Sequence, residues 1–199
     1  MKRKFGNAMG MKMITQKMKW GIMLLAIIVS TSAWAIEVTD ELNQSVTGVT
    51  STSYSNFSGK TVTSGAVYAG NCAGGNSSIQ LRTSSNSGVV TTTSGGKLKK
   101  ITVEWNSYTS SGRTLDIYGK NSAYTSASDL FNTSKQGTKL GSIVYGTSTE
   151  LIISGDYEYI GFRSNSNALY LTSVSIVWDK TPDAPTFSPV SGTTFTENL

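Results

Sequence analysis

Two carboxylates, Glu104 and Asp116, are the residues whose spacing best suits acid–base chemistry. They lie in two segments of alternating apolar and polar residues, 101–105 and 115–118, which a polar loop separates. If the segments pair as a β-hairpin, both carboxylates fall on its outer face, and glycoside hydrolases use such a pair. Nothing in the sequence marks an apolar pocket that would raise the pKa of either group. We therefore interpret both as solvated surface charges and keep a hydrolase as the third hypothesis.

Other catalytic chemistry lacks its residues. The sequence contains no histidine, which removes Ser-His-Asp and Cys-His nucleophile activation and the usual zinc ligands. The glycine-rich stretch 71–76 lacks the lysine and the helix of a phosphate-binding loop. The single cysteine, Cys72, excludes an internal disulfide; we interpret it as a small, semi-buried residue, with an intermolecular bridge or a reactive thiol as the alternative. We expect a protein that is not an enzyme.

Tyrosines, arginines and asparagines supply the groups that bind sugars. Aromatic rings cover the apolar side of a pyranose, and planar polar side chains bond its hydroxyls. Ile160 and Phe162 are expected to face inward, which turns their odd-numbered neighbours outward. The alternative is that the tyrosines pack on neighbouring strands and the asparagines serve turns. The residues that we predict to bind a ligand are Tyr157, Tyr159, Arg163, Asn165, Arg82 and Tyr68, with Tyr170 and Asn167 in the same class.

Calcium is the one metal that the residues suit. Asn71, Asn76, Asp116 and Asp156 carry hard oxygen donors, and glycine-rich loops add backbone carbonyls. No spacing of the EF-hand type is present, so a site would have to assemble from separate loops. Calcium stays a candidate, and no other cofactor is expected.

The elements that must position these residues are short strands. Turn residues separate alternating or β-branched segments, and no long amphipathic helix is visible. Eight or nine such strands predict an all-β fold, an antiparallel β-sandwich of jelly-roll type. The expected strands are 65–70, 79–83, 89–93, 101–105, 115–118, 138–145, 150–153, 157–163 and 169–178.

Local patterns refine this prediction. Residues 106–112 read as the loop of a central hairpin, 121–132 as a short helix or an ordered loop, and 36–59 as polar chain with one helical turn at 39–42. The apolar phase changes between Leu171 and Val174, which a β-bulge near Thr172 would accommodate. Trp105 and Trp178 share the parity of aliphatic neighbours and are expected in the core.

Two strand ends read alike. Residues 79–82 (IQLR) and 160–163 (IGFR) are each followed by a loop of serines and asparagines. A narrow residue alphabet explains the likeness by coincidence, because the later offsets differ. If the likeness reflects the fold, Arg82 and Arg163 lie at matching strand ends with their loops close together.

The first 35 residues are typical of a cleaved export signal. Six basic residues precede the apolar run 21–29, and Ala33-Trp34-Ala35 gives the small-x-small cleavage pattern. The run is about half the ~20 residues that a membrane helix needs, so no permanent span is expected. Subtracting the six basic residues from 17 leaves 11 Lys and Arg against 12 Asp and Glu, a net charge of −1. A nucleic-acid partner is therefore not indicated.

The domain organisation follows from these breaks. Residues 36–179 are expected to form the β-sandwich, 180–185 a proline-containing linker, and 186–199 the truncated start of a second, Ig-like domain. The predicted location is outside the cell or on its surface.

Three segments carry a resemblance to a known module. Residues 59–82, 97–124 and 157–178 together are similar to a module common in secreted multidomain proteins of Bacteroidetes, and the last segment resembles the closing strands of galactose-binding-like jelly rolls. The tail 184–195 is similar to the start of the Ig-like domain of chitobiase C-termini. The resemblance implies export, a β-sandwich, and a non-catalytic partner of other domains in the same chain.

Two functions follow from these expectations. The first is a binding module for a glycan or a cell-surface component, which the exposed tyrosines, arginines and asparagines favour. The alternative is a structural spacer of an adhesin-like protein, which the proline break and the further domain favour.

Overall fold

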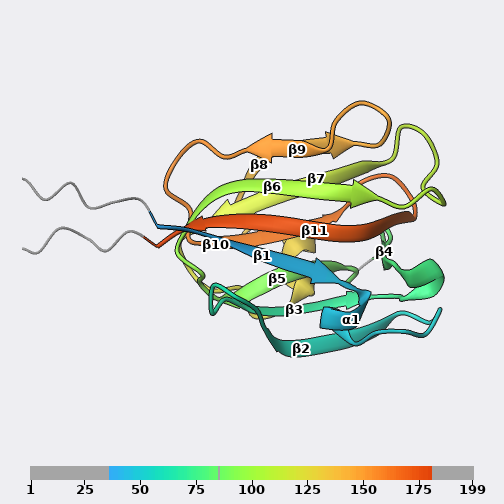
Figure 1. Ribbon diagram of the computed structural model, residues 1–199, viewed down its shortest axis with the longest axis horizontal. Helices are drawn as coiled ribbons and strands as arrows, with labels where there is room; N and C mark the ends of the chain where they lie inside the picture. Colours follow the sequence, from blue (N-terminus) through green and yellow to red (C-terminus); the bar gives the residue numbers. More distant parts are fainter. Residues whose placement is uncertain (1–35, 85, 181–199) are drawn as a thin grey trace, which may run out of the picture. The chain divides into compact units, whose positions relative to one another are not determined.

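The computed structural model describes residues 36–84 and 86–180. The predicted leader, the linker after Lys180 and the predicted second domain lie outside these residues. Two antiparallel sheets make up the described part (Figure 1), which confirms the all-β sandwich. It contains eleven strands, so the predicted count of eight or nine is wrong.

The two sheets are built from strands far apart in sequence. Sheet A has the order β1-β11-β6-β9, and β4 pairs with the start of β11; sheet B has the order β2-β3-β5-β10-β7-β8. The strands of sheet A are β1 (Glu37–Asn43), β4 (Ile79–Leu81), β6 (Lys97–Trp105), β9 (Glu150–Ile152) and β11 (Leu169–Asp179). Those of sheet B are β2 (Ser55–Thr61), β3 (Val67–Cys72), β5 (Gly88–Thr93), β7 (Thr114–Lys120), β8 (Thr138–Val144) and β10 (Tyr159–Ser164). Three short helices join them: α1 (Gln44–Thr47), η1 (Gly75–Ser77) and η2 (Ala127–Phe131).

Eight of the strands follow a jelly-roll path. β1-β11-β6-β9 faces β5-β10-β7-β8, and the chain crosses between the sheets as two Greek keys require. β2 and β3 extend sheet B beyond β5, and β4 adds to sheet A. The jelly-roll expectation is thus confirmed, with three strands inserted between the first and second strands of the path.

Two strands come from the polar stretch 36–59, where a helical turn and a loop were expected. β1 spans the residues of the supposed helical turn, and only Asp40 and Leu42 of this strand are buried. A buried carboxylate interrupts the apolar alternation that would have indicated a strand. β2 buries only Phe57, which leaves no periodic signal.

The predicted central hairpin is also wrong. β6 pairs with β11 and β9, whereas β7 pairs with β10 and β8, so the segment 106–113 crosses from one sheet to the other. Alternation fixes which side of a strand is buried but does not name its partner. Successive strands can therefore look like a hairpin in sequence and lie in different layers.

The predicted bulge in β11 is confirmed. The register against β6 shifts between Leu171 and Ser173. The shift keeps Leu169 and Leu171 on the same inner face as Val174, Ile176 and Trp178, all fully buried.

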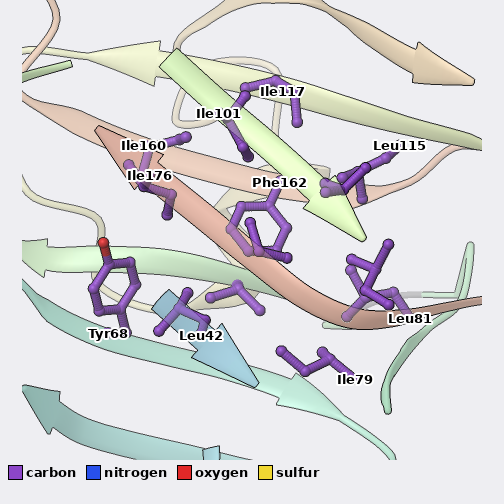
Figure 2. Close-up of a cluster of buried hydrophobic side chains, with 14 of the residues drawn as sticks. Leu42, Tyr68, Ile79, Leu81, Ile101, Leu115, Ile117, Ile160, Phe162 and Ile176 are labelled. Atoms are coloured by element: carbon purple, nitrogen blue, oxygen red, sulfur yellow. The ribbon is translucent and has the colours of Figure 1, made fainter. Parts of the chain in front are cut away.

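One interior lies between the sheets (Figure 2). Val103 and Ile176 from sheet A meet Ile160 from sheet B there. Each fully buried aliphatic or aromatic side chain contributes about 2 kcal/mol to folding. Trp178 is fully buried as predicted, and Trp105 packs at the border with its indole N–H donating to the Ser148 carbonyl at 3.1 Å.

A second apolar cluster covers the outer face of sheet B. Leu130 of η2 and Tyr124 lie over Val90, Ala69 and Tyr118. Gly161 of β10 permits this approach, because a Cβ there would lie 2.5 Å from the Leu130 Cδ2. The predicted short helix in 121–132 is therefore present, as a 3₁₀ turn.

The ends of the described chain lie together. The Lys180 amide donates to the Ile36 carbonyl at 2.8 Å. The start of β1 and the end of β11 lie at the left of Figure 1, opposite β4 and the end of β6. Within residues 36–84 and 86–180, no helix is long and apolar enough to cross a membrane.

Candidate functional site

The end of the sandwich opposite Ile36 and Lys180 gathers the loops that follow β4, β6 and β10. Leu81 pairs with Leu169, and Ser164 pairs with Leu115, so the chain around 82, 113 and 165 converges here. We call this region, at the right in Figure 1, the loop end.

Tyr108 stands on a firmly held loop of this end. The Thr109 hydroxyl donates to the Tyr170 carbonyl at 2.8 Å and accepts from the Tyr170 amide at 2.9 Å. The Asn106 amide also donates to the Tyr170 carbonyl, at 3.0 Å. The Tyr108 side chain is nevertheless 65 % exposed. An exposed ring on an ordered backbone is a suitable platform for a flat apolar ligand surface.

Tyr170 and Tyr54 continue the aromatic surface, and we call Tyr54, Tyr170 and Tyr108 the tyrosine row. The rings of Tyr108 and Tyr170 are 6.3 Å apart and tilted by 54°. Gln80 of β4 lies opposite Tyr170 in the sheet, and its side-chain amide donates to the Tyr170 hydroxyl at 3.1 Å. The Arg82 guanidinium lies 3.9 Å from the centre of the Tyr54 ring. The row thus combines rings with an amide and a guanidinium.

Electrostatics at Tyr54 reflect partial burial. Burial raises the pKa of Tyr54 to about 12, although the nearby positive charge of Arg82 lowers it. Its buried hydroxyl has no hydrogen-bond partner among the described residues. The phenol is therefore neutral at physiological pH, and its ring, not its hydroxyl, is the part that borders the surface.

A polar groove lies on the outer face of sheet A, beside Thr172 and Ser173 of β11. It has a volume of about 300 Å³. Glu104 accepts a hydrogen bond from Ser173 there, at 3.2 Å. The lining side chains are all hydroxyl, amide or carboxylate groups, from Glu41, Asn43, Gln44, Ser45, Ser77, Glu104, Thr172 and Ser173.

Another hollow, of about 310 Å³, lies between β2, β3 and the segment before η2. Its polar lining comes from serines, a threonine and asparagines, and its only ring is Phe57, which is 7 % exposed. Without an exposed ring, this hollow suits a pyranose less well than the tyrosine row does.

The predicted ligand-binding residues are divided among several places. Arg82 and Tyr170 meet at the tyrosine row. Tyr159 and Arg163 share the outer face of sheet B, where Tyr159 joins the cluster under η2 and Arg163 donates to the Tyr118 hydroxyl at 3.3 Å. Asn165 is exposed in the loop after β10.

Two of the predicted residues face the interior. Tyr68 is fully buried, so the expectation that it faces outward is wrong. Its hydroxyl donates to Asp40 at 2.9 Å, and burial raises the pKa of Tyr68. Tyr157 packs against the border of the main core, although it was expected outward. Residues 66–69 are apolar on both parities, which left their phase undecided in the sequence.

The carboxylate pair does not assemble. Glu104 is exposed on sheet A, whereas Asp116 is buried on the outer face of sheet B. Asp116 forms an ion pair with Lys139 at 2.8 Å and accepts from Ser142 at 2.7 Å. The two carboxylates lie apart because β6 and β7 lie in different sheets. The interpretation as a solvated surface charge holds for Glu104 and is wrong for Asp116, which is buried.

The proposed calcium donors are likewise apart. Asn71 donates to Asn56 on the strand pair β2–β3, and Asp156 lies 3.9 Å from Lys97. Within the described ranges, no group of three His, Cys, Asp or Glu residues is arranged to hold a metal ion.

Sequence reasoning missed two residues of the site. Tyr54 lies in the stretch 36–59, where no site residue was expected, and Tyr108 lies in the segment 106–112, which was expected to be a hairpin loop. A tyrosine in a loop of serines and asparagines carries no parity, so its exposure had no signal. No family model matches the chain, and no curated protein matches it.

Proposed function

We propose that this protein is a non-catalytic module that binds a glycan through the tyrosine row. The main observation behind this proposal is the exposed Tyr108 ring, which lies beside Tyr170 on a loop that the Thr109 hydrogen bonds hold. Gln80 bonds the Tyr170 hydroxyl, and Arg82 stacks on Tyr54 of the same row. Stacking on the rings would supply affinity, and the amide, guanidinium and groove hydroxyls would read the sugar hydroxyls.

The position of the two ends of the described chain supports this proposal. The hydrogen bond between Lys180 and Ile36 joins the end of β11 to the start of β1, and the loop end, which carries the tyrosine row, lies across the sandwich from them (Figure 1). A module of this kind presents its binding surface away from its connections. We propose export and a location on the cell surface or outside the cell for the same protein.

The alternative is a structural spacer. Spacers in a linear stalk need their two ends at opposite poles, and the adjacency of Ile36 and Lys180 does not favour that use. An ordered loop with an exposed tyrosine also has no role in a spacer.

A glycan array followed by calorimetry tests the proposal. We expect binding in the micromolar to millimolar range and a loss of about tenfold for Tyr108→Ala, since one stacking ring contributes about 1–1.5 kcal/mol. Ile152→Ala is the matched control, because Ile152 is an exposed large side chain of β9, 70 % accessible. A protein that binds no glycan at millimolar concentration, or a Tyr108→Ala variant that binds normally, contradicts the proposal.

A further inference from the structure

Arginine is confined to the loop end. The described residues contain three arginines: Arg82 directly after β4, Arg113 directly before β7, and Arg163 near the end of β10. The strand pairings Leu81–Leu169 and Ser164–Leu115 bring these three positions to the same end of the sandwich.

None of these arginines forms an ion pair with a carboxylate of the described residues. All five ion pairs in this part of the chain use lysine. Asp116 lies opposite Arg163 across the strand pair, yet it is bound by Lys139. The guanidinium groups of Arg82 and Arg163 rest instead on the rings of Tyr54 and Phe131, at 3.9 and 4.7 Å. Stacking holds a guanidinium in place while its N–H edge stays able to bind an anion.

Unpaired polar atoms gather at the same end. Three buried side-chain atoms of the described residues have no hydrogen-bond partner: the Tyr54 hydroxyl, the Arg113 Nε and the Arg163 Nε. Buried polar groups are normally paired, and exceptions call for an unseen partner or a functional reason. Their confinement to the loop end marks this end as short of acceptors.

Arg82 is the arginine of the loop end that lies at the tyrosine row. It is exposed, it stacks on Tyr54, and it follows the strand whose Gln80 bonds Tyr170. The carboxylate of Glu104 in the groove lies beside Ser173 of β11. Arg82 follows Leu81, which pairs with Leu169, four residues earlier in the same strand. Negative charge on a ligand is therefore favoured at Arg82 and disfavoured in the groove.

We infer that the ligand is an acidic glycan, whose carboxylate or sulfate group binds Arg82 while a neighbouring sugar ring stacks on Tyr170 and Tyr108. This inference rests on the proposed function and names the ligand class of the same site. Carboxylate and sulfate share the chemistry that a guanidinium recognises, a planar pair of acceptor oxygens.

The test compares matched probes on the intact protein. A hexamer of galacturonic acid and its methyl ester differ by one charge and one methyl group on each sugar, and a carrageenan-derived hexasaccharide supplies sulfate without carboxylate. We expect one of the two acidic glycans to bind at least about tenfold more tightly than the neutral ester. The reason is that a hydrogen bond from a guanidinium to an anionic oxygen is stronger than one to a neutral oxygen. The advantage is expected to shrink between 0.05 and about 0.5 M salt, because the site is exposed.

Variants assign the preference to a residue. Arg82→Gln is expected to remove the advantage of the acidic glycan and to leave the affinity for the ester, whereas Arg82→Lys retains part of it. Lys97→Gln is the matched control, because Lys97 is an exposed cation at the start of β6, away from the loop end. This variant is expected to bind as the wild type does. Thermal unfolding shows whether Arg82→Gln is folded; if it is not, the comparison of acid, ester and salt in the wild type decides.

The outcomes separate the two proposals. Equal binding of ester and both acidic glycans, or an Arg82→Gln variant that keeps the preference, overturns the inference and leaves the glycan proposal standing. Absence of binding to every glycan overturns both. A preference for galacturonate alone assigns carboxylate, and a preference for the carrageenan fragment alone assigns sulfate.

Discussion

At the scale of single residues, Asp40 is the exceptional side chain. It is fully buried between the sheets, where a charge is costly unless hydrogen bonds replace its water. Four donors do so: the Ser64 amide at 2.7 Å, the Ser64 hydroxyl at 2.6 Å, the Tyr68 hydroxyl at 2.9 Å and the Trp178 indole N–H at 2.8 Å. The carboxylate thus ties β1 and β11 of sheet A to the start of β3 in sheet B.

Asp40→Asn is expected to destabilise the fold by about 3 kcal/mol, because the new amide group presents a donor where only donors face it. Urea unfolding followed by tryptophan fluorescence measures the change. Glu41→Gln, on the exposed side of the same strand, is the matched control and should alter stability by less than about 0.5 kcal/mol. Equal effects of the two changes would refute the account of Asp40.

The buried thiol of Cys72 is expected to make the stability of the fold depend on pH. Burial raises the pKa of its thiol from 9.0 to about 11, against a hydrogen bond with Thr47 that lowers it. The folded state therefore holds the proton more tightly than the unfolded state, so stability is complete below pH 9 and is lost as the pH rises from 9 toward 11. The expected loss is about 2 kcal/mol by pH 11. Unfolding curves of wild type and Cys72→Ala measure it, and the variant should lose less; parallel curves would contradict the prediction.

At the scale of elements, the segment 121–137 covers the outer face of sheet B. Leu130 enters where Gly88 and Gly161 remove side chains from neighbouring strands; a Cβ at Gly88 would lie 2.8 Å from the Leu130 Cδ1. Asp129 holds the turn by accepting from the Thr125 amide at 2.7 Å and hydroxyl at 2.8 Å. These bonds and the Lys120 charge lower the pKa of Asp129 despite the opposing effect of burial. The predicted ligand residue Tyr159 is occupied in this packing.

Gly161→Ala is expected to displace η2 and to destabilise the protein by about 1–3 kcal/mol, since overpacking forces side chains from their rotamers. Leu130→Ala alone should cost about 2–5 kcal/mol through the lost methyl groups. The double variant should cost clearly less than the sum, because the shortened residue 130 makes room for the new methyl group. Additive costs in chemical denaturation would show that the two residues do not share this contact.

At the scale of the whole molecule, the fold separates its ends from its proposed binding surface. The loop end lies across the sandwich from the start of β1 and the end of β11, which the hydrogen bond between Lys180 and Ile36 joins (Figure 1). β11 runs the length between them, and it carries Tyr170 at one end and Asp179 at the other.

The separation predicts a dependence on the point of attachment. Protein immobilised through Glu37→Cys should bind its glycan with wild-type affinity, whereas immobilisation through Ser107→Cys, next to Tyr108, should abolish binding. Cys72 is buried and should not compete for the thiol reagent. Surface plasmon resonance measures both, and equal binding from the two attachments would place the site elsewhere.

Residue patterns were sufficient for the fold class and for most strands. Alternation identified the inward sets of β6, β10 and β11, including the bulge between Leu171 and Ser173, because burial of one face leaves a period of two in the sequence. They also predicted that Arg82 faces outward, and Arg82 is exposed.

The tertiary structure alone decided which strands are neighbours and which polar groups are buried. Glu104 and Asp116 separated because pairing partners are chosen by the packing of two layers, and alternation is the same for either choice. Tyr68 turned inward because Asp40, 28 residues away in sequence, accepts its hydroxyl. Tyr108 stands exposed on an ordered loop because Thr109 bonds Tyr170 across 61 residues. Contacts of that range depend on the whole chain closing, so no local pattern records them.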